Sequence, residues 1–190
     1  MESLSLDGQA MTAAADYATT FSIQDCAVTA AKIHAFSTCG RQSGPKVFSR
    51  CIATLVQTTY DAGGHQRWGS GTLYDHVHVD GSLLLVDNGT RGSGHGWSDA
   101  NSTAYNCCTT QQYKVQEPPT AHNWAFGCTG SLLAGSDGQV VSNGTRMVPD
   151  SLYGQQLVDR GRAAAPAAPT GRPAGPPKAP PLGVGPPAWD

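Results

Sequence analysis

Five short stretches of this chain repeat one pattern, and they decide its fold. They are SIQDC (Ser22–Cys26), VFSRC (Val47–Cys51), LYDHV (Leu73–Val77), TAYNC (Thr103–Cys107) and WAFGC (Trp124–Cys128). In each, an apolar residue stands two or three positions before a polar residue, which Cys or Val follows. The units recur at the period of one solenoid coil, with loops of variable length between them. A strand this short cannot bury its own apolar face, so successive units must stack to form a core. The repeat predicts an all-β solenoid, a parallel β-helix.

The last residue of each unit is predicted to point into the core. This inward ladder consists of Cys26, Cys51, Val77, Cys107 and Cys128. Free Cys packs as a small hydrophobe, so the ladder needs no disulfide. Zinc binding is the alternative, but the chain has no C-x-x-C pair, and side chains stacked along one line cannot form a tetrahedron. We therefore expect core packing and no metal site. Cys39 and Cys108 lie outside the ladder and are unexplained.

The repeat also sets the domain boundaries. Residues 21–158 are predicted to form the β-helix domain, and residues 1–20 its edge or the start of a fragment. Further strands fit at Ser82–Val86 and at Tyr113–Gln116, and turns at Asn88-Gly89 and Gly92–Gly96.

The C-terminal part divides into a helix and a tail. Residues 150–158 place apolar side chains at helical spacing behind Asp150, an acidic N-cap. This predicts a short helix that caps the open end of the solenoid, where strand edges would otherwise be unpaired. Residues 159–190 are rich in Pro, Ala and Gly. Such a composition cannot bury enough apolar surface to offset its ordering entropy, so a disordered tail is predicted.

Composition narrows the classes of partner. The 190 residues have a formal net charge of −2, and only 14% are charged. This gives no electrostatic footprint for nucleic acid or for an anionic membrane. No apolar run approaches the roughly 20 residues that span a bilayer. We therefore expect no nucleic-acid partner and no membrane span. The protein is also expected to be a monomer.

Three N-x-[ST] sequons favour a secreted or extracellular protein. They begin at Asn88, Asn101 and Asn143, where chance would give about one. The competing explanation is that Asn-Gly-Thr is simply a good turn. Residues 1–17 have no features of a signal peptide. A chain that has lost its true start would reconcile these observations.

Three segments concentrate His, Trp and polar side chains beyond what core packing requires. They are His65–Trp68, Gly92–Trp97 and Pro118–Trp124. Trp68, Trp97 and His122 each precede a rung of the ladder by a similar offset, which is shortest for His122. Similar offsets in a solenoid place residues on one lateral face. Aromatic rings stack on sugar rings, and planar polar groups bind hydroxyls and carboxylates. The segments therefore predict a polysaccharide-binding strip.

Each segment also has a structural explanation. Trp124 begins a repeat unit and can be half core, Gly92–Gly96 can be only a turn, and a single surface His usually just forms hydrogen bonds. Recurrence at similar offsets favours function. The predicted substrate-binding residues are Trp68, Trp97, His122 and Asn123, and the predicted catalytic residues are His95, His65 and Arg67.

Several strings together resemble a known family. They are Gly44–Phe48 before a Cys, His65–Trp68, Gly92–Trp97, Pro118–Ala125, and Ser151–Tyr153 with Gln156–Leu157. In this order they make residues 21–157, most of the chain, similar to an uncharacterised group of right-handed β-helix proteins. The group belongs to the pectin-lyase superfamily and is often labelled polysaccharide-lyase-like. Members carry earlier coils, so the resemblance implies that this chain is the C-terminal part of a longer solenoid.

The same resemblance adds His34 to the substrate-binding residues. Typical members have an acidic residue directly after this His, where this chain has Ala35. The departure puts in question any activity that depends on that carboxylate.

Chemistry favours a lyase over a hydrolase. A uronate lyase takes a proton from the carbon next to the carboxylate, which requires a base and a group that neutralises the developing enolate. His65 or His95 is the predicted base and Arg67 the neutralising cation, with His122 and Asn123 in support.

A glycoside hydrolase instead needs two carboxylates facing the bond at roughly 5–10 Å. The candidates Asp61, Asp75 and Asp99 are scattered along the sequence. The alternative from a different class is a non-catalytic carbohydrate-binding or cell-surface module, or a truncated remnant of an enzyme. No cofactor is indicated; some lyases use calcium, but nothing in this sequence points to it.

Overall fold

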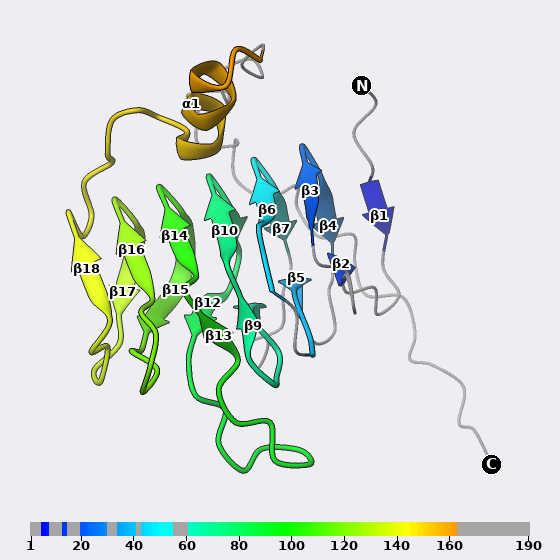
Figure 1. Ribbon diagram of the computed structural model, residues 1–190, viewed down its shortest axis with the longest axis vertical. Coiled ribbons are helices and arrows are strands. Elements are labelled where there is room, and N and C mark those ends of the chain that lie inside the picture. The colour runs from blue at the N-terminus through cyan, green and yellow to red at the C-terminus, as the bar shows by residue number, and fades with distance from the viewer. Residues whose placement is uncertain are drawn as a thin grey trace, which may run out of the picture.

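Among the described residues, the regular secondary structure is all strands except for one short helix. The structure is a computed structural model, and it describes the strands at 5–7 and 13–14 and residues 20–29, 34–40, 43–54 and 61–162. Figure 1 shows strands stacked along the molecule with one helix beside them. The predicted tail beyond residue 162 and most of residues 1–20 lie outside the described residues. Within the described ranges, no helix is long and apolar enough to cross a membrane.

The first sheet contains the repeat units. Its strands are β3 (Phe21–Gln24), β6 (Lys46–Ser49), β10 (Thr72–Asp75), β14 (Thr103–Tyr105), β16 (Trp124–Phe126) and β18 (Gln139–Val141), each parallel to its neighbours. Val47 lies opposite Leu73, Leu73 opposite Thr103, and Thr103 opposite Trp124. These are the first residues of their units, so the alignment made from the sequence is confirmed.

A corner with a left-handed backbone follows the strand in each repeat unit. The fourth residue of every unit has a φ between 50° and 63°: Asp25, Arg50, His76, Asn106 and Gly127. The N–H of each corner donates to the next coil, as Arg50 does to Asp75 O at 2.9 Å. A left-handed conformation costs a non-glycine residue about 1 kcal/mol. The hydrogen bonds between coils hold four non-glycine residues in it.

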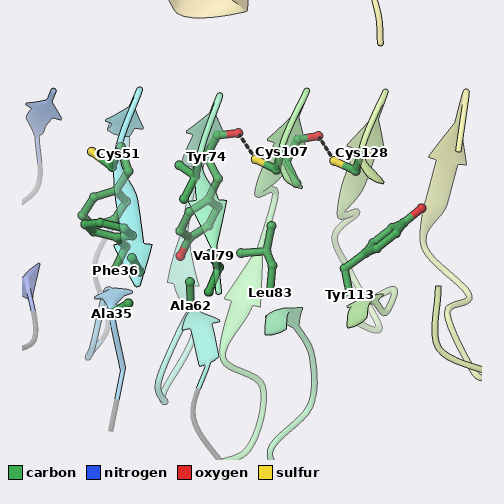
Figure 2. Close-up of a cluster of buried hydrophobic side chains, with 14 of the residues drawn as sticks. Ala35, Phe36, Cys51, Ala62, Tyr74, Val79, Leu83, Cys107, Tyr113 and Cys128 are labelled. Carbon is green, nitrogen blue, oxygen red and sulfur yellow. Dashed lines mark hydrogen bonds between the residues drawn. The ribbon is translucent and has the colours of Figure 1, made fainter. Parts of the chain in front are cut away.

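The residue after each corner fills the core, as predicted. Cys51, Val77, Cys107 and Cys128 are at most 2% exposed, and Cys26 is half-buried. All six cysteines are free thiols. In Figure 2, Cys107 donates to the carbonyl oxygen of Tyr74 at 3.2 Å, and Cys128 donates to that of Ala104 at 3.6 Å. Each of these thiols therefore fills a rung and binds the coil before it.

The second sheet joins two faces of the stack. Its strands are β1 (Ser5–Asp7), β4 (Ala27–Thr29), β7 (Ile52–Thr54), β11 (His78–Val79), β15 (Cys108–Val115), β12 (Ser82–Leu85), β8 (Asp61–Gly63) and β17 (Thr129–Leu132). The long strand β15 pairs with β11 through its first residues and with β12 through its last. The strands expected at Ser82–Val86 and Tyr113–Gln116 are thus β12 and the end of β15.

Two short parallel pairs complete the coils, β2 (Ala13–Ala14) with β5 (Phe36–Ser37) and β9 (Gly69–Ser70) with β13 (Asp99–Ala100). Inside, the ring of Phe48 stacks on Tyr74 with centroids 5.5 Å apart and tilts against Phe36 at 5.7 Å. Parallel sheets thus curl around one core, an arrangement compatible with a parallel β-helix.

The C-terminal helix forms, but it does not cap the open end of the stack. Helix α1 spans Leu152–Asp159, and its N-cap is Ser151, whose Oγ accepts a hydrogen bond from Gly154 N at 2.9 Å. Asp150, the expected cap, lies one residue earlier. In Figure 1 the chain leaves β18 at one end and runs back along the stack, so that α1 packs beside β10. The prediction of an end cap was wrong.

Polar side chains of the first sheet explain this return. The returning chain, residues 146–152, is called the return segment below. Tyr105 Oη donates to Pro149 O at 2.6 Å, and Asn106 Nδ2 donates to Asp150 O at 2.8 Å. These hydrogen bonds fix the return segment against the flank of the stack.

Replacing Asp75 by alanine tests the docking of the helix. The buried carboxylate of Asp75 accepts hydrogen bonds from Ser151 Oγ and, at 3.0 Å, from Leu152 N. Asp75→Ala removes the acceptor of these two donors and of Ser49 Oγ, which donates to Asp75 Oδ2 at 3.2 Å, and should lower the free energy of unfolding by about 2–3 kcal/mol. Denaturant unfolding measures it. Asp150→Ala is the control, because the Asp150 side chain is 45% exposed and its contacts are with His76 and with exposed Arg146; a partly exposed carboxylate of this kind contributes about 1 kcal/mol or less. Equal losses would contradict the assignment of Asp75 as the helix anchor.

Candidate functional site

Three histidine rings meet on one flank of the stack. His34 lies just before β5, His65 just after β8, and His95 in the loop between β12 and β13. The ring centroids of His34 and His65 are 4.6 Å apart, and those of His65 and His95 are 4.7 Å apart. All three residues are half-buried. The structure therefore brings three of the predicted site residues together, and we call them the histidine row.

Asp61 supplies the histidine row with a carboxylate. Its Oδ1 is hydrogen-bonded to His34 Nδ1, and the two residues form a β-bridge between coils. Ala35 is fully buried in the core, so an acidic side chain at that position would lie among apolar groups. The carboxylate beside His34 thus comes from the next coil. Sequence reasoning missed this role because only the stacking register joins residues 34 and 61.

The loop that carries His95 is tied to the stack. Residues 86–98 protrude beyond the strands in Figure 1. The side-chain amide of Asn88 donates to His65 O at 2.8 Å, which fixes the loop against the second ring of the row. His95 Nε2 lies so close to Gly92 that a methyl group at that position would collide with it. The glycine therefore lets the ring fold back onto its own loop.

Arg67 and Trp68 extend the site toward solvent. Both have a positive φ, 60° and 57°, which is rare for two consecutive bulky residues. Their N–H groups donate to His95 O at 3.1 Å and Trp97 O at 2.8 Å, so the protruding loop holds this backbone. The rings of Trp68 and Trp97 have centroids 6.3 Å apart. Arg67 is exposed and Trp68 is 40% exposed. A cation and two aromatic rings thus continue from the histidine row.

His122 occupies a different part of the coil. Its N–H donates to Asn101 Oδ1 at 3.3 Å, and Asn101 already lies past Trp97 along its coil. The ring of His122 lies 5.9 Å from Trp124, and its Nδ1 lies 3.2 Å from a Glu117 carboxylate oxygen. In the sequence, His122 precedes its ladder residue by fewer positions than Trp68 and Trp97 do, which already indicates that it lies further along its coil. These contacts place His122 around a corner from the histidine row.

Asn123 lies inside the stack. It is 0% exposed, and its side-chain amide bonds only to backbone: it accepts from Ser102 N at 3.0 Å and donates to Asp99 O and Gln116 O at 3.1 and 3.0 Å. The expectation that Asn123 touches a ligand is corrected by this burial. The residue ties neighbouring coils together.

A second buried carboxylate supports the backbone beside the histidine row. Asp99 Oδ2 accepts a hydrogen bond from Gly64 N, directly before His65, at 2.6 Å. Burial raises the pKa of Asp99 to about 6, opposed by its hydrogen bonds and by the charge of Lys46. Burial also lowers the pKa of Lys46 to about 8. Asp99 is thus a positioning group behind the row.

The described side chains were also compared with the arrangement that a metal site requires. In the parts of the chain that the structure describes, no group of three or more His, Cys, Asp or Glu side chains is arranged to hold a metal ion.

Comparison of the chain with protein-family models, curated proteins and solved structures finds no match. The resemblance to the pectin-lyase superfamily therefore stays a prediction that rests on the sequence strings.

Proposed function

We propose that this protein is a secreted, right-handed parallel β-helix of the pectin-lyase type that binds an acidic polysaccharide. The observation that carries the proposal is the convergence of the rings of His34, His65 and His95 beside exposed Arg67 and Trp68. Indole faces stack on sugar rings, and a guanidinium binds a carboxylate through two parallel hydrogen bonds. An acidic sugar chain satisfies both.

On this proposal the reaction is β-elimination, with His65 as the base. His65 takes the proton from the carbon next to the uronate carboxylate. The electron pair forms a C=C bond as the C–O bond to the next sugar breaks, and the leaving oxygen takes a proton from solvent. Arg67 holds the carboxylate and neutralises the enolate. His65 suits the role better than His95, because it is central in the row and His95 Nε2 faces Gly92.

Hydrolysis is the weaker assignment because the three candidate carboxylates are already engaged. Asp61 bonds to His34, Asp75 to the start of α1, and Asp99 to Gly64. A hydrolase needs a facing pair of carboxylates that act on the same bond.

A non-catalytic binding module is the second candidate, and one observation favours it. Arg67 and Trp68 lie on an exposed flank, whereas stabilisation of an enolate is strongest where water is excluded. Incubating the protein with pectate, alginate and glycosaminoglycans, and following the absorbance of the new C=C bond, separates the two. A lyase yields unsaturated product, and a module binds without product. The absence of both binding and product would contradict the proposed function.

Replacing Arg67 by lysine tests the contact with the carboxylate. Lysine keeps the charge but loses the planar fork, so Arg67→Lys should weaken binding of a uronate oligomer by about tenfold and of a neutral oligomer by less than about twofold. Calorimetric titration measures both affinities. Arg160→Lys, at the end of α1, is the matched control and should change neither. Equal weakening for both ligands would exclude Arg67 as the uronate contact.

A further inference from the structure

The ladder of inward residues ends in an asparagine. Strand β18 and the two residues after it, Ser142 and Asn143, repeat the pattern of the earlier units. Ser142 forms the left-handed corner with a φ of 56°, and Asn143 follows at the position that Cys128 holds in the coil before. Gly144 N donates to Cys128 O at 2.8 Å, the same hydrogen bond that joins the earlier rungs. Asn143 is therefore the last rung of the described stack.

This last rung lies at an open end. Figure 1 places β18 at the end of the stack, where among the described strands only β16 pairs with it, and β17 pairs only with β15. Leu132 of β17 is 38% exposed. A strand edge with unpaired N–H and C=O groups is a template for pairing with another chain, so proteins usually cover or block it. Helix α1 leaves this end uncovered because it packs beside β10.

The side chain of Asn143 is presented with its nitrogen available. All three residues of its sequon, Asn143, Gly144 and Thr145, are exposed. Tyr113 Oη donates to Asn143 Oδ1 at 2.6 Å, and Figure 2 shows this hydroxyl directed toward the last coil. Asn143 Nδ2 donates to no residue in the part of the chain that the structure describes. A turn closed by Thr145 N and Ser142 O at 3.0 Å displays the sequon, and Gly144 supplies the φ of 79° that this turn requires.

The other two sequons are less accessible. Asn88 is only 9% exposed, and its Nδ2 already donates to His65 O beside the histidine row. Asn101 is exposed, but its sequon enters β14, and Ser102, the middle residue, is fully buried. Of the three sequons, only the one that begins at Asn143 is exposed at every residue.

We infer that Asn143 is the acceptor of an N-linked glycan, and that this glycan covers the open end of the stack. Asn143 Nδ2 forms a bond with C1 of the first sugar as the bond from C1 to the diphosphate of a lipid-linked oligosaccharide donor breaks. The diphosphate leaves with the electron pair of that bond, and Nδ2 gives up one proton to solvent.

The bond from Tyr113 is compatible with this modification, because Asn143 Oδ1 stays an acceptor when Nδ2 carries a sugar. A bulky, hydrated glycan at the last rung hinders pairing along the edge of β18. The inference rests on the secreted location in the proposed function and is independent of the polysaccharide site.

The test is to express the full chain behind an added signal peptide in a eukaryotic cell and to map glycan occupancy at each sequon by mass spectrometry. We expect Asn143 to have the highest occupancy and Asn88 the lowest. Thr145→Ala should abolish occupancy at Asn143 while keeping the bond from Tyr113, whereas Thr145→Ser preserves the sequon and should keep both. Light scattering should show Thr145→Ala associating at concentrations at which Thr145→Ser does not.

Two results would overturn the inference. One is a wild-type chain in which Asn143 carries no glycan, or less than Asn88 or Asn101. The other is an unglycosylated Thr145→Ala that associates no more than Thr145→Ser. Titrating the same samples with a uronate oligomer reports separately on the proposed function, because the histidine row lies on the flank of the stack. Loss of uronate binding with Asn143 occupied would overturn the proposed function and support the glycan site.

Discussion

Replacing Asn123 by alanine is expected to lower the free energy of unfolding by about 3–5 kcal/mol, because each buried polar group left without a partner costs about 1–3 kcal/mol. The side chain is fully buried and serves three backbone groups, the N–H of Ser102 and the carbonyls of Asp99 and Gln116. Alanine replaces none of these bonds. Urea unfolding, followed by circular dichroism, measures the loss.

The neighbouring residue provides the control for this variant. The side chain of His122 is 64% exposed. Since surface substitutions change stability little, His122→Ala should cost less than about 0.5 kcal/mol. If Asn123→Ala cost under about 1 kcal/mol and weakened polysaccharide binding instead, Asn123 would be a ligand contact and its assignment here would be wrong.

Replacing His65 by glutamine is expected to reduce formation of unsaturated product by about 100- to 10,000-fold, the range lost when a positioned general base is removed. Glutamine keeps a polar side chain of similar reach, so binding of the oligosaccharide should change by less than about threefold. Absorbance of the C=C bond gives the rate, and titration calorimetry gives the affinity.

His122→Gln is the matched control for the rate, because His122 lies outside the histidine row. It should retain full product formation. A wild-type rate in His65→Gln would remove His65 from the mechanism. A large loss in both variants would place the reaction elsewhere on the surface.

The stacked core was readable from the sequence because a solenoid converts sequence period into spatial register. Cys51, Val77, Cys107 and Cys128 share one local pattern, and the same backbone corner precedes each of them. The left-handed corner and the buried residue after it depend only on residues next to each other in the sequence, so a short sequence pattern is enough to predict both. The meeting of two histidines was predictable for the same reason, since His65 and His95 precede their rungs by equal offsets.

Side-chain contacts between different coils could not be predicted from the sequence. Asp61 reaches His34 through the register of two coils, and no local string records that pairing. The docking of α1 depends on Asp75, 77 residues before Leu152, so helical spacing gave the helix but not its position. Asn123 was assigned to the surface because it stands beside His122, although alternate residues of an extended chain face opposite sides.

The most direct test of the central claim uses the six histidines as reporters. Their ring signals are followed by NMR while the protein is titrated with oligomers prepared from pectate and alginate. His34, His65 and His95 form the row, whereas His76, His78 and His122 lie elsewhere and serve as controls within the same molecule. We expect the three signals of the row to shift together and saturably, and the other three to stay in place. Shifts confined to His76, His78 or His122, or no shift with any acidic oligomer, would contradict the account.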